Sequence, residues 1–191
     1  MRIITGTAKG CRLKAPKGMS TRPTSDRIKE SLFSILGSLV PDASVLDLFA
    51  GTGGLGLEAL SRGASHAVFV DASTADIIRE NAEHARLLEN AEIVRREAIA
   101  FLGHWAGGER RFDLIFCDPP YHKGLWEKAL VMVDRGDLLL PGGVLVVEHG
   151  GDERRLPELR ALECVREVSY GHTSAIRMFR KKEALKEAGS P

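Results

Sequence analysis

Short apolar segments alternate with amphipathic segments along most of the chain. Seven segments have the length and apolar character of strands: residues 44–49, 67–71, 92–96, 112–118, 142–150, 162–171 and 174–181. A helical spacing of apolar residues follows each of the first four, and near-continuous apolar strands are typical of a sheet buried on both faces. The pattern predicts an α/β fold, with a doubly wound, mostly parallel, seven-stranded sheet and helices on both of its faces.

The first 40 residues do not follow this alternation. Two apolar patches around Gly6 and Gly10 predict a small basic β-hairpin, and apolar residues at helical spacing from Ile28 to Leu39 predict a helix. Thr24 or Ser25 is the expected N-cap of that helix. Further on, Ser73 and Asp76 have the spacing of a capping box. The predicted division is a basic hairpin extension over residues 1–22, a main domain over 23–182 and a flexible tail over 183–191.

Charge is unevenly distributed along the chain. Residues 1–29 carry eight Lys or Arg side chains against Asp26 alone, a net charge of +7, and the chain total of +1 leaves −6 for the remainder. A basic segment on a mildly acidic body suggests a polyanionic partner, although a solvated basic tail gives the same pattern. The residues expected to contact the phosphates of such a partner are Lys9, Arg12, Lys14, Arg27 and, further along the chain, Lys123.

Three scattered cysteines without C-x-x-C spacing argue against a disulfide framework and against a zinc site, so no metal is expected. No apolar run approaches the length of a membrane-spanning helix, and no signal peptide follows Met1. The sequence therefore predicts a cytoplasmic protein with no membrane association.

A glycine-rich turn follows the first strand of the main domain. Gly51, Gly53 and Gly56 satisfy G-x-G-x-x-G, and Asp71 lies 20 residues after Gly51, at the end of the second strand. This spacing is typical of dinucleotide sites, so a nicotinamide enzyme is one reading. The other reading is an S-adenosylmethionine site. It explains Asp47 better, because a carboxylate inside an apolar strand needs donors, which the glycine loop or the methionine end of that cofactor can supply.

The fourth strand ends in Asp118, Pro119, Pro120 and Tyr121. The two prolines have no N–H to give to the sheet, so the chain leaves it there in a rigid, extended form. The Asp118 carboxylate and the Pro119 carbonyl can each accept a hydrogen of an exocyclic base amine and stabilise the positive charge that develops on methylation. The Tyr121 ring offers a face on which the base can stack.

These motifs, in this order, resemble the class I S-adenosylmethionine-dependent methyltransferases, which have a Rossmann-like fold. More closely, "RPTSDRIKESLFSIL" and the N-terminal "RIITGTAKGCRLKAP" are similar to the RsmD family of bacterial 16S rRNA guanine-N2 methyltransferases, and this likeness covers nearly the whole chain. The resemblance implies S-adenosylmethionine as cofactor and the N2 amine of guanine 966 as target. It places the methionine end on Asp47, Phe49, Ala50, Gly51, Thr52 and Gly53, the ribose on Asp71 and Ala72, the adenine on Glu97 and Ala98, and the entrance at Arg22 and Thr24.

The resemblance further implies a monomer whose substrate is 16S rRNA within a partly assembled small ribosomal subunit. The motif alone does not choose between guanine N2 and the N6 amine of adenine in DNA or RNA. The short chain leaves no room for a separate domain that reads DNA sequence, which argues against a DNA enzyme. A nicotinamide dehydrogenase would not need the Asp-Pro-Pro-Tyr motif, and a non-catalytic RNA-binding module would not need an intact glycine turn.

Overall fold

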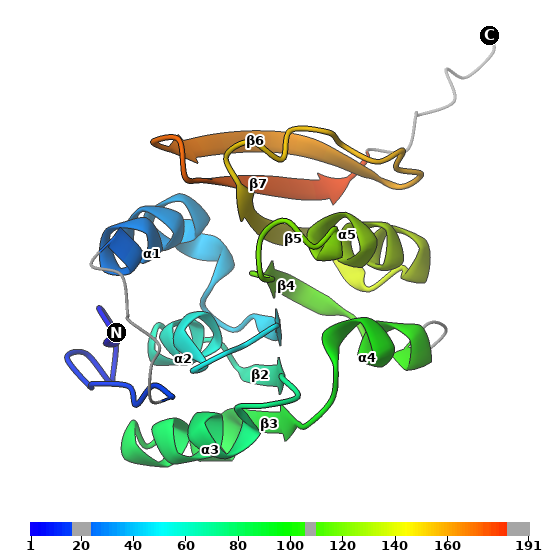
Figure 1. The fold of residues 1–191 in the computed structure, drawn as a ribbon. Coiled ribbons are helices and arrows are strands. Elements are labelled where there is room, and N and C mark those ends of the chain that lie inside the picture. The colour runs from blue at the N-terminus through cyan, green and yellow to red at the C-terminus, as the bar shows by residue number, and fades with distance from the viewer. Residues whose placement is uncertain (17–23, 106–109, 183–191) are drawn as a thin grey trace, which may run out of the picture.

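The computed structural model describes residues 1–16, 24–105 and 110–182 and contains one seven-stranded sheet (Figure 1). Its strands are β1 (Ser44–Leu48), β2 (His66–Val70), β3 (Ala91–Val94), β4 (Phe112–Cys117), β5 (Leu139–Gly150), β6 (Leu162–Tyr170) and β7 (Ser174–Lys181). Their order across the sheet is β3-β2-β1-β4-β5-β7-β6. Only β7 runs against its neighbours β5 and β6. The predicted α/β fold with a mostly parallel, seven-stranded sheet is confirmed.

Helices cover both faces of the sheet (Figure 1). One face carries α1 (Thr24–Leu36), α2 (Gly54–Ser61) and α3 (Ala75–His84), and the other carries α4 (Ala98–Trp105) and α5 (Leu125–Gly136). Short 3-10 turns lie at Gly37–Leu39 and Leu88–Asn90. Within the described ranges, no helix is long and apolar enough to cross a membrane.

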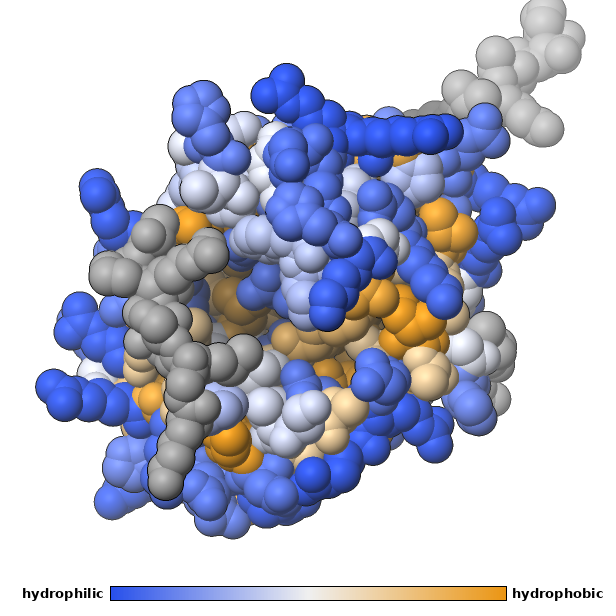
Figure 2. All heavy atoms as spheres, viewed as in Figure 1, coloured by the Kyte–Doolittle hydropathy of each residue, from blue (hydrophilic) through white to orange (hydrophobic). Residues whose placement is uncertain are grey.

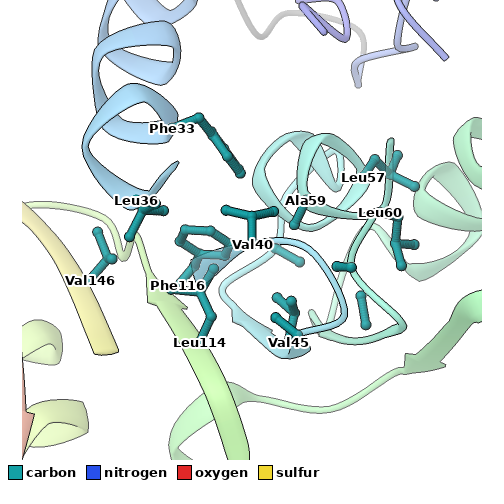
Figure 3. Close-up of a cluster of buried hydrophobic side chains, with 14 of the residues drawn as sticks. Phe33, Leu36, Val40, Val45, Leu57, Ala59, Leu60, Leu114, Phe116 and Val146 are labelled. Atoms are coloured by element: carbon teal, nitrogen blue, oxygen red, sulfur yellow. The ribbon is translucent and has the colours of Figure 1, made fainter. Parts of the chain in front are cut away.

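The core has two halves, one on each side of the sheet. Alternate residues of the central strands point in opposite directions: Val45 and Phe116 pack toward α1 and α2, whereas Leu46 and Ile115 pack toward α4 and α5. Figure 3 shows the first half, in which Phe33 of α1 meets Phe116 with ring centroids 5.7 Å apart. Burial on both sides explains why these strands read as continuous apolar runs.

The predicted N-terminal β-hairpin is wrong. Within residues 1–16 the structure has no strand and only an isolated antiparallel bridge between Arg2 and Arg12. The Ile3 and Leu13 N–H groups bond across this bridge to the Cys11 and Met1 carbonyls, but the backbone from residue 4 to residue 8 bonds to α2 and does not extend the pairing into strands. The Glu58 carboxylate accepts the Ile4 and Thr5 N–H groups at 2.7 and 3.0 Å, and Ser61 Oγ accepts the Ala8 N–H at 2.9 Å. A distant helix thus satisfies the donors that a hairpin ladder would have used.

Glu58 also forms ion pairs with two basic side chains in the interior. It is fully buried and pairs with Lys29 of α1 at 3.2 Å and with Arg62 at 2.8 Å. Lys29, only 4% exposed, donates a further hydrogen bond to the Arg2 carbonyl. Burial lowers the pKa of Lys29, and the Glu58 carboxylate opposes that change. Lys29 therefore belongs to the interior and not to the basic surface that the charge count suggested.

The predicted capping box of Ser73 and Asp76 is also wrong. The N-cap of α3 is Thr74, and its side chain makes no capping bond. Instead, the Asp71 carboxylate accepts the N–H groups of Ser73 at 2.8 Å and of Thr74 at 3.0 Å, two and three residues further along the chain. Backbone N–H groups next to the start of α3 therefore bond to the acid that follows β2.

Three expectations concern parts of the chain that the structure does not describe. They are the cavity entrance at Arg22, the flexible tail at 183–191, and the N-cap at Thr24 or Ser25, whose side chains are not described although Thr24 is the first residue of α1.

Candidate active site

A cavity of about 680 Å³ lies at the carboxyl ends of the central strands. The strand order reverses between β1 and β4, and open α/β sheets bind ligands in the crevice at such a point. The residues after both strands line the cavity, Phe49–Thr52 after β1 and Asp118–Tyr121 after β4. Figure 2 shows apolar residues inside a hollow on the viewed face, with hydrophilic residues around it.

The glycine turn needs backbone conformations that few residues other than glycine adopt. Phe49, Gly51 and Gly53 have φ of 58°, 56° and 79°, and the Gly53 N–H closes the turn on the Ala50 carbonyl at 2.7 Å. Gly56 has a different role, because a Cβ there would lie 2.3 Å from the Phe69 ring. Gly56 thus lets α2 approach β2 closely, which brings the N-terminus of that helix to the cavity.

Two carboxylates stabilise the glycine turn and the start of α2 by accepting hydrogen bonds from backbone N–H groups. Asp47, 2% exposed, accepts the Gly56 N–H at 2.8 Å, and Asp71 accepts the Gly51 N–H at 3.0 Å. Burial raises the pKa of Asp47 to about 7, the Gly56 N–H opposes this, and the charge of Asp71 adds to it. A carboxylate inside an apolar strand needs a hydrogen-bond donor, and for Asp47 the first turn of α2 supplies it.

The N-terminal segment forms part of the cavity wall, which the sequence did not predict. Met1 and Ala15 line the cavity, and the Met1 sulfur lies 3.7 Å from the Thr52 hydroxyl. Asn81 of α3, 1% exposed, joins this segment to the glycine turn. Its side-chain oxygen accepts the Lys14 N–H at 2.7 Å, and its amide donates to the Lys14 carbonyl at 3.1 Å and the Thr52 carbonyl at 2.9 Å.

The other side of the cavity carries a cluster of acids around Tyr121. The Tyr121 hydroxyl donates a 2.5 Å hydrogen bond to Glu148, which lies near the end of β5 and also lines the cavity. Cys117 pairs with Val147 in the β4–β5 register, so Asp118 and Glu148 are the next residues of adjacent parallel strands. Glu148 was not among the residues that the sequence predicted for the site. Its cavity role was missed because the neighbouring strand is visible only in the folded chain.

The electrostatics of this cluster favour protons and hydrogen-bond donors. Asp118 is exposed and lines the cavity. The surrounding protein displaces water from its carboxyl group, and this desolvation, followed by the charges of Glu148 and Asp47, raises the pKa of Asp118 well above its usual range. Burial and the bond to Glu148 likewise raise the pKa of Tyr121. A ligand group that carries N–H donors or positive charge would therefore be favoured here.

The structure brings most of the predicted site residues to this one cavity. Lining it are Asp47, Phe49, Ala50, Gly51, Thr52, Asp71, Ala72, Glu97, Ala98, Asp118, Pro119, Pro120 and Tyr121. Gly53 shapes the turn but does not line the cavity, since a Cβ there would face Leu57 and Ile78. Within the described residues, no group of His, Cys, Asp or Glu side chains has a metal-binding arrangement.

The residues expected to contact RNA lie on the surface. Lys9, Arg12, Arg27 and Lys123 are exposed. Lys14 is exposed as well, but its ammonium group pairs with Glu80 at 2.6 Å. Contact of Lys14 with a phosphate would therefore compete with an existing ion pair.

The cavity is suited to a nucleoside with a charged amino-acid tail. Its volume lies within the usual range of about 300–1,000 Å³ for small-molecule sites. Apolar walls from Phe49, Val70 and Ala98 can enclose a planar ring, and Asp71 at the end of β2 can accept ribose hydroxyls. The N-terminus of α2 and the nearby acid Asp47 can receive the carboxylate and ammonium groups of a methionine moiety.

Comparison with known proteins identifies the family. The model of the family described as Conserved hypothetical protein 95 matches residues 1–179. The chain belongs to this family. Ribosomal RNA small subunit methyltransferase D of Escherichia coli is 32% identical over 95% of this chain and 90% of its own length. The resemblance to the RsmD family is therefore confirmed.

Two further similarities extend over nearly the whole chain. The Bacillus subtilis protein YlbH, provisionally named an rRNA methyltransferase, is 40% identical over 95% of this chain and 100% of its own length. The solved structure of yhhF from Escherichia coli, provisionally named a methyltransferase, superposes with a TM-score of 0.83 at 33% identity and covers 95% of this chain and 98% of that one. The shared fold thus includes the elements that form the cavity.

Proposed function

We propose that this chain transfers a methyl group from S-adenosylmethionine to the exocyclic N2 amine of a guanine in bacterial 16S rRNA, guanine 966 by resemblance to the RsmD family. Membership of that family, with relatives named rRNA methyltransferases, supports the coarser assignment of an S-adenosylmethionine-dependent rRNA methyltransferase. The observation that carries the proposal is that the glycine turn and the Asp118–Tyr121 segment, which follow adjacent parallel strands, line one cavity.

The residues after β4 supply acceptors for the amine. The lone pair of a guanine amine is delocalised into the ring, so the nitrogen is a poor nucleophile. If Asp118 and the Pro119 carbonyl each accept one amine hydrogen, they draw the nitrogen toward tetrahedral geometry and stabilise the positive charge that develops there. S-adenosylmethionine supplies an electrophilic methyl group on its sulfonium. The elevated pKa of Asp118 also suits it to receive the proton that the amine releases.

Tyr121 is placed to hold the base. We assign its ring as the stacking surface, which by analogy with single-strand binding contributes about 1–3 kcal/mol. The hydrogen bond from its hydroxyl to Glu148 fixes the orientation of that ring. A base in this cavity cannot remain in a duplex, so the target nucleotide is unpaired or flipped out, at a cost of a few kcal/mol.

The remaining assignments concern the macromolecular substrate. Exposed Lys9, Arg12 and Arg27 on the N-terminal side and Lys123 beside Tyr121 would contact phosphates, with Lys14 contributing where Glu80 releases it. Arg22 and Thr24 would border the entrance, as the resemblance implies. We further propose that the protein acts as a monomer in the cytoplasm, on 16S rRNA within a partly assembled small subunit.

Mass spectrometry of rRNA tests the proposal. The 16S rRNA of cells that lack the gene should lose one N2-methylguanine, and the purified protein with S-adenosylmethionine should restore it on small-subunit particles from those cells. Methyl groups on an adenine would favour the N6 alternative, and an unchanged rRNA that the purified protein cannot methylate would refute the proposal.

A further inference from the structure

The acid cluster at the Tyr121 end of the cavity can distinguish one purine from another. Guanine presents two adjacent donors on its Watson–Crick edge, the N1 hydrogen and the N2 amine. Adenine presents an amine beside N1, which is an acceptor. A carboxylate only accepts hydrogen bonds, so a pair of carboxylates matches the guanine edge and repels the adenine edge.

The two carboxylates are correctly placed to be such a pair. Asp118 and Glu148 follow paired residues of adjacent parallel strands, whose backbones lie about 4.8 Å apart. Both line the cavity, and after desolvation the charge of Glu148 is the largest cause of the raised pKa of Asp118. Two donors of one ligand would relieve this repulsion.

Tyr121 links base stacking to this acid pair. Its hydroxyl points at Glu148, to which it donates a hydrogen bond of 2.5 Å. A base that lies flat on the Tyr121 ring can therefore direct one edge toward the same carboxylate. A carboxylate has about four acceptor positions, so Glu148 can accept a ligand hydrogen while it keeps Tyr121 and its other contacts.

We propose that Glu148 determines the specificity for guanine by accepting the N1 hydrogen of the base, while Asp118 and Pro119 accept the hydrogens of the N2 amine. This inference rests on the proposed function and names a residue that the Asp-Pro-Pro-Tyr motif does not contain. It also separates guanine from adenine on physical grounds, because an adenine in the same position would direct its N1 lone pair at the Glu148 carboxylate.

A target RNA in which the methylated guanine is replaced by 2-aminopurine tests the proposal. This analogue keeps the N2 amine but has an acceptor at N1. We expect wild-type protein to prefer guanine in kcat/KM, and we expect Glu148→Gln to reduce that preference about 10- to 100-fold, because the glutamine amide can either accept or donate. The analogue also lacks O6, but this loss is the same for both proteins and cancels in the ratio of preferences.

Glu163→Gln is the matched control, since Glu163 is an exposed residue of β6 outside the cavity and should keep the wild-type preference. If Glu148→Gln does not fold, Tyr121→Phe serves instead. It keeps the ring, removes the bond that orients Glu148, and should reduce the preference about 3- to 10-fold.

The outcomes separate this inference from the proposed function. If Glu148→Gln, or Tyr121→Phe in its place, methylates guanine with the wild-type preference unchanged within twofold, the role of Glu148 is refuted while the proposed function stands. If wild-type protein methylates neither purine at N2, the proposed function itself fails.

Discussion

Replacing Asn81 by alanine should loosen both the fold and the cofactor site. Asn81 makes three hydrogen bonds, two to Lys14 and one to the Thr52 carbonyl. At a net value of about 1 kcal/mol each, their loss should lower the free energy of unfolding by about 2–4 kcal/mol. With a urea m-value of about 2–3 kcal/mol/M, the unfolding midpoint should fall by about 1 M.

The bond to Thr52 also predicts an effect on ligand binding. This hydrogen bond holds the glycine turn in its binding conformation. If its loss costs about 1 kcal/mol of binding free energy, the affinity for S-adenosylmethionine should fall about fivefold. Urea unfolding followed by fluorescence of Trp105 and Trp126 gives the stability, and calorimetric titration gives the affinity.

Asn90→Ala is the matched control for this prediction. Asn90 makes one exposed hydrogen bond, to the Ser65 carbonyl, and its removal should shift the midpoint by less than about 0.3 M. An Asn81→Ala protein with a midpoint within 0.3 M of wild type and an affinity within twofold would refute the argument that this side chain joins the N-terminal segment to the turn.

Three further predictions concern single groups. Asp118→Ala should abolish methyl transfer while the Kd for S-adenosylmethionine changes less than about fivefold; near-wild-type turnover would remove Asp118 from the chemistry. Asp47 binds its proton more tightly in the native state, so its contribution to stability is complete below about pH 4 and is lost as pH rises through about 7. The difference in the free energy of unfolding between Asp47→Asn and wild type should therefore shift in favour of the variant by up to about 4 kcal/mol between pH 4 and pH 8, and a difference that is equal at both pH values would contradict this. The double variant Lys9→Glu with Arg12→Glu should weaken RNA binding and reduce its dependence on salt concentration, whereas Lys128→Glu on α5 should change neither. If the salt dependence of the double variant equals that of wild type, the basic segment does not contact RNA phosphates.

Much of the fold could be predicted from local patterns. The central strands are buried on both faces, so their apolar runs identify them without knowledge of their neighbours. Gly51 and Gly53 lie in the left-handed region and Gly56 allows close packing, so the glycine motif identified the turn correctly.

The errors arose where distant groups replaced local partners. Residues 2–12 have hairpin-like spacing, but the Glu58 carboxylate binds the N–H groups of Ile4 and Thr5 from 54 and 53 residues away in the chain. Ser73 has capping-box spacing, but Asp71 already satisfies the helix start. The cavity roles of Met1 and Glu148 depend on which strands and segments become neighbours, and no motif in the sequence encodes that.

The proposed reaction requires Asp118, the acid after β4, to face the methyl group of the donor within the cavity. A crystal structure with bound S-adenosylhomocysteine tests this most directly. We expect the sulfur atom to point at the Asp118 carboxyl group, with space between them for one methyl group and one amine nitrogen. A sulfur atom directed away from Asp118, with another part of the ligand against the Asp118–Tyr121 segment, would contradict it.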